Sequence, residues 1–208
     1  MNPNDLPSIQ EFRTTAQSLA MLDAILCPEW QYRYFSFDSK WATGMEMASM
    51  RNGCGDDWHL LFDSVGAALK GFAHELANDY SFPKRLRTEV PGDFASFLDE
   101  PAFSMEFATF CYWRKVDDMA WNKVRSLMPD DGAAEMLNQI VAGPRGYKYW
   151  AEDYFEVPVE LQSVCAVFDH TPLSNEIISA LNPEADIAFT ISQAVEIGYP
   201  RRETRQER

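Results

Sequence analysis

The sequence predicts an α+β fold in which an antiparallel meander sheet of about five strands follows an N-terminal helix and precedes a C-terminal group of helices. Two observations carry this prediction. Between residues 32 and 74, apolar and polar side chains alternate with the period of two that is typical of strands. From residue 130 onward the period changes to that of helices. Because strands and helices are segregated along the chain, the pattern indicates α+β and not repeated βαβ units.

The first expected element is an amphipathic helix over residues 8–26. It begins at a capping box, in which Ser8 and Glu11 satisfy free amide groups reciprocally. Its apolar residues recur three and four positions apart, and Cys27-Pro28 ends it. We expect this helix to pack on the meander that follows.

Four strands are expected between residues 32 and 74, and a fifth over residues 107–115. Asn52-Gly53 marks a short hairpin, because both residues tolerate a positive φ. Aromatic and sulfur-containing side chains fall on both faces of this sheet. Helices must therefore cover at least one face.

The C-terminal part is expected to be helical. Asp130 or Asp131 caps a helix that Gly143-Pro144 stops, and residues 147–155 place their aromatic side chains on one helical face. Further helices are expected to begin at Pro158, at Thr171-Pro172 and at Asn182-Pro183, with the last ending near Gly198. We expect one domain over residues 1–200, with a sheet part (1–128) and a helical part (129–200), and a disordered charged tail over 201–208.

The composition limits the classes of function. With 18 basic and 32 acidic residues the net charge is −14, which repels nucleic acid phosphates and favours a basic protein partner. No apolar run reaches the length of a membrane span, and the N-terminus lacks the features of a secretory signal. The four cysteines form no closely spaced pair, so we expect free thiols and a cytoplasmic location.

The common signatures of catalysis and of cofactor binding do not occur in the sequence, and we expect no cofactor. One alternative is a metal site formed by His59, His74 and Glu75, if the sheet register brings them together. The other interpretation is that each histidine is half-exposed and bonded to backbone or to a carboxylate. The sequence does not decide between them.

Aromatic residues near acids suggest a binding surface. The six tryptophans and eight tyrosines are many for a core of this size, because each N–H or O–H needs a partner when buried. Aromatic anchors ringed by carboxylates suit an interface with a basic protein, although they also suit the half-buried edge of a core. The residues that we select for this surface are Trp41, Tyr147, Trp150, Glu152, Asp153 and Glu156.

Several segments resemble those of a group of uncharacterised bacterial proteins. They are YRYFSFDSKW, EMASMRNGCGDDW, GAALKGFAHE, FSMEFATFCYWR and ALNPEADIAFTISQAVEIGYP, which together span most of the chain. The group resembles small acidic cytosolic proteins of the kind that neutralise toxins, and the resemblance implies a bacterial cytosolic origin. The acidic composition, the aromatic excess and the missing catalytic signatures favour a non-enzymatic protein that binds a basic partner, and an immunity protein is the specific form of this leading hypothesis. A small enzyme or metal-binding protein and a homo-oligomer without chemistry of its own are the alternatives.

Overall fold

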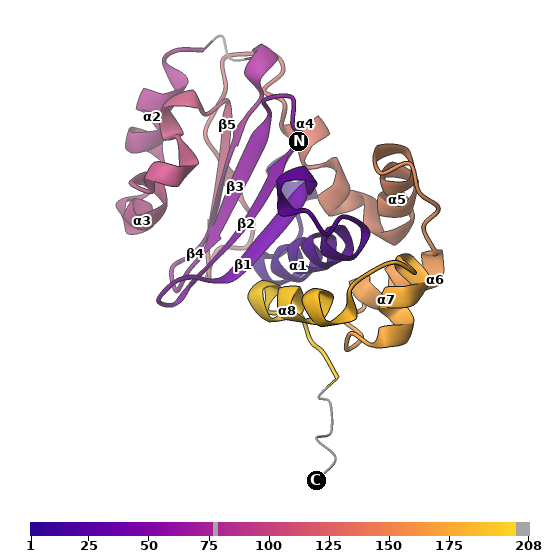
Figure 1. Cartoon of the computed structure of the whole chain (residues 1–208). Helices are drawn as coiled ribbons and strands as arrows, with labels where there is room; N and C mark the ends of the chain where they lie inside the picture. The colour runs from indigo at the N-terminus through magenta and orange to yellow at the C-terminus, as the bar shows by residue number, and fades with distance from the viewer. Residues whose placement is uncertain (77–78, 203–208) are drawn as a thin grey trace.

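The structure, a computed structural model, describes residues 1–76 and 79–202 and has the predicted α+β architecture (Figure 1). One antiparallel sheet contains six strands in the order β1-β2-β3-β4-β5-β6, whereas the sequence predicted about five. The strand order follows the chain order, so the sheet is a meander. The strands are β1 (Phe35–Ala42), β2 (Met45–Arg51), β3 (Asp57–Phe62), β4 (Gly66–Phe72), β5 (Phe110–Lys115) and β6 (Asn122–Lys123).

The register places the alternating side chains on two distinct faces. In β3, Trp58 and Leu60 point into one core, whereas Leu61 points into another. The hairpin between β2 and β3 turns at Asn52-Gly53, where Gly53 has the positive φ of 74° that the sequence predicts. We call the side that contains Trp58 the first face and the side that contains Leu61 the second face.

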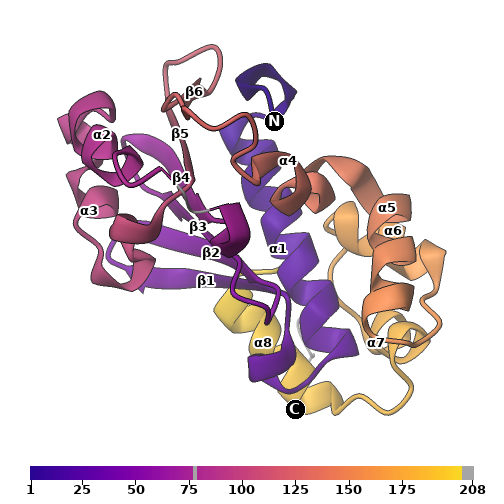
Figure 2. The ribbon, with the colours of Figure 1, turned by 90° about the horizontal axis from the view of Figure 1, so that it is seen from above.

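The first face is covered by the N-terminal helix and by helices from the C-terminal part (Figure 2). The expected capping box forms at the start of α1, where Ser8 accepts from the Glu11 amide and Glu11 accepts from the Ser8 amide. The helices on this side are α1 (Ile9–Leu26), α4 (Ala133–Met136), α5 (Asn138–Tyr154), α6 (Leu161–Phe168), α7 (Asn175–Leu181) and α8 (Ile187–Ile197). The left-handed backbone of Gly143 breaks α5 into two parts, as expected from Gly143-Pro144.

Three of the expected helix starts are wrong by a few residues. The helix expected to begin at Pro158 is α6, which begins at Leu161 after Glu160 caps it. Ser174 caps α7 and Asp186 caps α8, and in both cases the cap accepts a hydrogen bond from an amide three residues later. The Thr171-Pro172 and Asn182-Pro183 pairs lie in the preceding turns instead. The end of α8 at Gly198 is confirmed.

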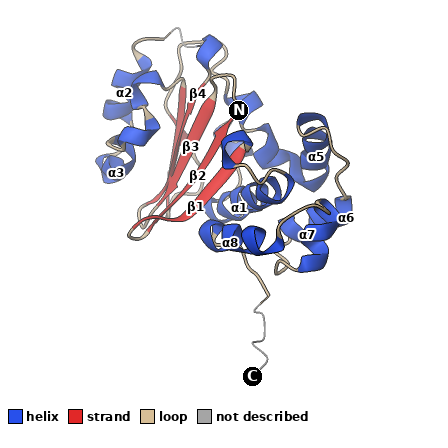
Figure 3. Cartoon of the chain, viewed as in Figure 1, coloured by secondary structure: helices blue, strands red, loops and turns tan. Residues whose placement is uncertain are grey.

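The second face is covered by α2 (Phe82–Glu89) and α3 (Ala95–Leu98), which Figure 3 shows on the opposite side of the sheet from α1. The segment that contains α2 had no expected helix, because its apolar positions Phe82 and Leu86 are separated by a run of basic side chains. Both residues are buried against Leu61 and Cys111 of the sheet. The fold therefore has three layers, because helices cover at least part of each face of the sheet.

Much of the aromatic excess is accommodated in the core. Trp58, Trp121, Tyr112, Tyr147 and Tyr199 are all buried, and each polar ring atom donates a hydrogen bond to a carbonyl or a carboxylate. The number of tryptophans and tyrosines is thus weaker support for an interface than the sequence alone suggests. No helix in residues 1–76 and 79–202 is long and apolar enough to cross a membrane. Of the expected tail, residues 203–208 lie outside the described residues.

Candidate functional site

The structure separates the residues that the sequence grouped into one binding surface. Tyr147 is completely buried, so it cannot contact a partner. Trp150 is half-buried and packs against five other aromatic rings, including Tyr34 at 4.8 Å and Phe35 at 5.5 Å between ring centroids. Trp41 lies at the far end of β1, where it stacks on Phe103 of the second core. Since β1 rises about 3.3 Å per residue, Trp41 and Tyr34 are roughly 20 Å apart.

The three acids of the expected surface have different environments. Glu152 forms an ion pair with Lys148 and accepts from the Val159 amide, so its charge is largely compensated within the chain. Asp153 and Glu156 are exposed, and the described residues offer neither of them an ion pair. Of the three expected acids, Asp153 and Glu156 are therefore the two whose charges are available to a basic partner within the described part of the chain.

An exposed group of aromatic side chains lies beside these acids. The Arg51 guanidinium lies 3.6 Å above the Trp30 ring, and the Arg51 amide donates to the Tyr34 carbonyl. Tyr34 in turn packs against Tyr154, with ring centroids 5.2 Å apart. Trp30, Tyr32 and Tyr154 are 55%, 61% and 40% exposed. We define the aromatic face as Trp30, Tyr32, Tyr34, Arg51 and Tyr154.

Acidic side chains lie close to the aromatic face in sequence. Burial, followed by the charges of Tyr154, Glu135, Asp56 and Asp23, raises the pKa of Tyr34 to about 12. Glu29, next to Trp30, is exposed like Asp153 and Glu156, and none of the three is ion-paired within the described part of the chain. Arg51 is the basic member of the face, and its charge is held over the Trp30 ring.

The sequence did not group Trp30, Tyr32 and Arg51 with residues 147–156. Trp30 and Tyr32 lie in a 3-10 turn before β1, and Arg51 ends β2. They meet the end of α5 only because β1 and β2 pair so that Phe35 faces Met50. A signal was present in the WQYRY segment, in which aromatic residues are dense and which lies directly after a helix stop.

The expected metal alternative has no geometric support among the described residues. His74 Nδ1 lies 2.8 Å from Asp56 in the β2–β3 hairpin, and its Nε2 is 3.9 Å from Glu75. His59 instead lies on the second face, where its ring stacks on Phe103. No group of three or more metal-ligating side chains comes together in residues 1–76 and 79–202. The two histidines thus lie apart. His74 is bonded to a carboxylate, as in the second interpretation of the sequence, whereas the buried Nδ1 of His59 has no hydrogen-bond partner among the described residues.

The cysteine thiols, and a serine hydroxyl opposite His59, are the possible nucleophiles considered among the described residues. All four cysteines are unpaired, and burial raises the pKa of Cys111 far above its usual value. Ser49 and His59 face each other directly across β2 and β3, but the structure places no hydrogen bond between their side chains. His59 has its Nδ1 3.4 Å from Asp57, which already pairs with Lys70. A nucleophile activated by a base is therefore not formed at this position.

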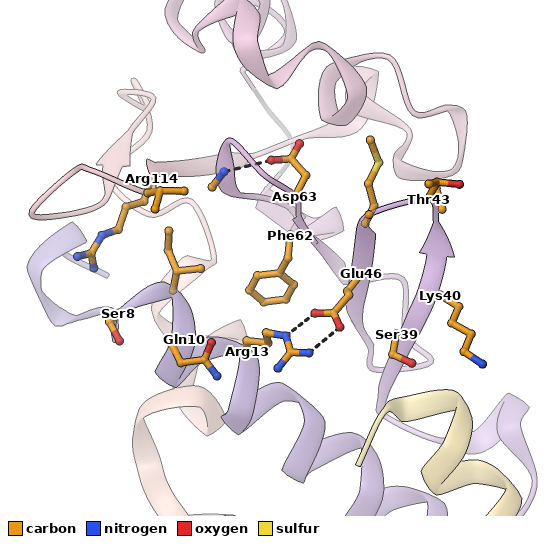
Figure 4. A pocket seen from close by; sticks show the side chains of 16 residues that line it. Ser8, Gln10, Arg13, Ser39, Lys40, Thr43, Glu46, Phe62, Asp63 and Arg114 are labelled. Carbon is orange, nitrogen blue, oxygen red and sulfur yellow. Dashed lines mark hydrogen bonds and ion pairs between the residues drawn. The ribbon is translucent and has the colours of Figure 1, made fainter. Parts of the chain in front are cut away.

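A groove of about 920 Å³ lies at the opposite end of β1 and β2 from the aromatic face. Figure 4 shows the groove between the first turns of α1 and the hairpin that joins β1 to β2, with Phe62 near its centre. Arg13 of α1 reaches across to Glu46 of β2 with two hydrogen bonds, the second of which is 2.6 Å long. This pair fixes one wall of the groove. No catalytic side chain arrangement accompanies it.

Comparison with known proteins found no match, since no family model matches the chain and neither a curated protein nor a solved structure is significantly similar to it.

Proposed function

We propose that this protein is a non-enzymatic binding protein that captures a basic protein partner at the aromatic face. The observation that carries the proposal is the composition of that face. It combines three exposed aromatic side chains, an arginine stacked on a tryptophan, and three exposed acids at its margin. Tryptophan, tyrosine and arginine are the residues that most often dominate the binding energy of protein interfaces.

Charge determines which kind of partner the face fits. The chain carries a net charge of −14, and within residues 1–76 and 79–202 the acids beside the face form no ion pair. A basic protein is therefore attracted over distances of about a Debye length, and its encounter rate falls as salt rises. The exposed rings would then control how slowly the complex dissociates.

The finer proposal is that the partner is a toxin and that this chain is its cytoplasmic immunity protein. Support comes from the resemblance of the YRYFSFDSKW and EMASMRNGCGDDW segments to a group of uncharacterised bacterial proteins that resembles small acidic toxin-neutralising proteins. These two segments include Tyr32, Tyr34 and Arg51 of the aromatic face. The four unpaired cysteines are compatible with the reducing environment that this role requires.

The first experiment identifies the partner by its position on the surface. A photo-crosslinking amino acid is placed at Tyr32, which is 61% exposed on the aromatic face, and at Tyr80, which is 88% exposed elsewhere. We expect one basic protein to be cross-linked in cells from position 32 and not from position 80. Cross-linking to a second copy of this chain, or equal yields from both positions, would contradict the proposal.

The second experiment measures the purified pair by surface-based kinetics. Charge neutralisation by Glu29→Gln, Asp153→Asn and Glu156→Gln together should slow association about tenfold at low salt and weaken its salt dependence. Trp30→Ala and Tyr154→Ala should each speed dissociation about tenfold or more. Tyr80→Ala is the matched control and should change neither rate. If the triple variant associates as fast as the unmodified protein, the aromatic face is not the docking surface.

A growth assay tests the toxin part separately. The cross-linked partner should arrest growth when expressed alone, and co-expression of this chain should restore growth. The Trp30→Ala and Tyr154→Ala variants should protect less at equal abundance. A partner that binds at the face but is harmless when expressed alone would retain the binding function and exclude the immunity role.

A further inference from the structure

The groove beneath the β1–β2 hairpin has the properties of a ligand site, and it is independent of the aromatic face. Its volume of about 920 Å³ lies in the range of small-molecule sites in proteins, about 300–1,000 Å³. Its wall and floor include five apolar side chains from four segments of the chain. They are Ile9, Ala42, Met45, Phe62 and Val116.

The acids that line the groove are already occupied. Both oxygens of Glu46 accept from Arg13. Asp63 accepts from the amides of Val65 and Gly66 in the β3–β4 turn, and its other oxygen accepts from Ser96. A cationic ligand would therefore find no free carboxylate in this groove.

Two of the basic side chains that line the groove are not occupied in this way. Lys40 is exposed, and within the described residues its ammonium forms no ion pair. Arg114 donates from Nε to the Asp118 carbonyl, which leaves both terminal amino groups without a partner in the described part of the chain. Figure 4 shows these two side chains at opposite ends of the groove. In a chain with 14 more acidic than basic residues, a concavity with an excess of positive charge is unusual.

The first turn of α1 contributes side chains to the wall of the groove. Its capping box satisfies two of the free amide groups of the helix start, those of Ser8 and Glu11. The basic side chains that can attract an anion into the groove are Lys40, Arg114 and the outer edge of Arg13, and the apolar surface that can attract an apolar group lies around Phe62.

We propose that this groove binds a small organic anion with an apolar body, of which a medium-chain carboxylate is the simplest example. The apolar body lies over Phe62, Met45 and Val116, and the carboxylate pairs with Arg114 or Lys40. Charge selects the anion, because the groove offers unpaired basic groups and no unpaired acid. The apolar surface selects an amphipathic molecule over a free inorganic ion.

The test uses 8-anilino-1-naphthalenesulfonate, a fluorescent aromatic anion, as the probe on the full chain. Its emission should rise on binding, and octanoate should displace it. Octanol and octylammonium have the same apolar body without the negative charge, so they should compete poorly. Equal displacement by all three compounds would show that charge plays no part and would overturn the proposal.

Variants locate the probe. Lys40→Gln and Arg114→Gln should each weaken probe and octanoate binding about two- to fivefold, as expected for a solvent-accessible ion pair. Lys84→Gln removes the same charge from an exposed position of α2 and should have no effect. Ala42→Trp, at the exposed rim, should fill the groove and abolish binding.

A thermal melt of each variant separates loss of binding from loss of fold. Lys40 and Ala42 are exposed, so their variants should have the same melting temperature as the unmodified protein. Probe binding that persists in folded Ala42→Trp would place the probe elsewhere and overturn the proposal. The kinetics at the aromatic face should be unchanged in these variants, because the groove lies at the other end of β1 and β2.

Discussion

The two faces of the sheet each bury an ionisable side chain, and they do so by different means. On the first face, Asp23 of α1 is completely buried and accepts three hydrogen bonds, from the amides of Tyr34 and Phe35 and from the Tyr147 hydroxyl. On the second face, the Lys70 side chain is 1% exposed, and its ammonium lies 2.7 Å from Asp57. The Asp23 carboxyl group is thus held by neutral donors, whereas the Lys70 ammonium is held by an opposite charge.

The difference determines what each group does for the fold. Asp23 connects three segments that are distant in sequence, namely α1, the start of β1 and α5, and so it also supports the aromatic face. The Lys70–Asp57 pair connects only two neighbouring strands that are already paired in register. We therefore expect the stability of the first face to depend on the presence of a hydrogen-bond acceptor at position 23. We expect the stability of the second face to depend on the balance between the charges of Lys70 and Asp57.

Removal of the Asp23 acceptor should have the largest effect. Asp23→Ala leaves two amides and one hydroxyl buried without an acceptor, and should lower the free energy of unfolding by about 3–5 kcal/mol. Urea unfolding followed by tryptophan fluorescence measures this change. Asp23→Asn is the matched control, because its carbonyl can accept from the two amides and its amino group can donate to the Tyr147 oxygen. If both variants lose the same stability, the charge and not the acceptor matters.

The pH dependence of stability is the second prediction. Burial raises the pKa of Asp23 to about 7 from its usual 3.8, although the Phe35, Tyr147 and Tyr34 hydrogen bonds and the Arg33 charge oppose the shift. The folded state thus holds this proton more tightly than the unfolded state. The contribution of Asp23 to stability is fully present below about pH 4 and falls as the pH rises to 7, by at most about 4 kcal/mol.

The Asp23→Asn variant isolates this contribution from those of the other titrating groups. The difference in unfolding free energy between the variant and the unmodified protein, measured from pH 4 to pH 8, should shift steadily in favour of the variant as the pH rises. A difference that does not change with pH would mean that Asp23 has an ordinary pKa in the folded protein.

The third prediction concerns the second face. Asp57→Asn removes one charge and leaves Lys70 buried without its partner, so it should cost about 2 kcal/mol. This is less than the usual penalty for such a change, because the Asp57 side chain is 32% exposed and water can replace part of the interaction. Lys70→Met removes the buried charge and should change stability by less than about 1 kcal/mol, even though one carboxylate loses a partner. The opposite order would show that Lys70 stabilises the fold through the ion pair itself.

The sequence predicts the fold of both faces better than it predicts their buried charges. Strand alternation identifies Trp58 and Leu60 as neighbours on one face, because side-chain direction has a period of two. It does not reveal α2, because only Phe82 and Leu86 mark its buried side. Asp23 looks like a surface residue near a helix end, and only the pairing of α1 with Tyr34 and Phe35 shows that it is buried.

For the candidate site, too, the sequence predicts local features but not contacts between distant segments. Local spacing identifies the acids Asp153 and Glu156 beside the face, but the aromatic residues of α5 that it selects, Tyr147 and Trp150, belong to the core or pack against it. Most of the aromatic face comes from other segments, including Trp30, Tyr32 and Arg51, which approach α5 only through the register of β1 and β2. Local patterns cannot supply such contacts, because they do not determine which segments become neighbours in space.

The smallest effect is expected at the solvent-accessible end of the first face, where Arg13 of α1 pairs with Glu46 of β2. Their side chains are 31% and 22% exposed, so water competes for both charges, and the pair is worth about 1 kcal/mol or less despite its two hydrogen bonds. A double-mutant cycle of Arg13→Gln and Glu46→Gln, measured by urea unfolding, should give a coupling energy in that range and should fall further in high salt. A coupling energy well above 2 kcal/mol would mean that water is excluded from the Arg13–Glu46 pair to the same degree as from Asp23. In that case the deeply buried acceptor and the half-exposed ion pair on this face would not differ in the way that we expect.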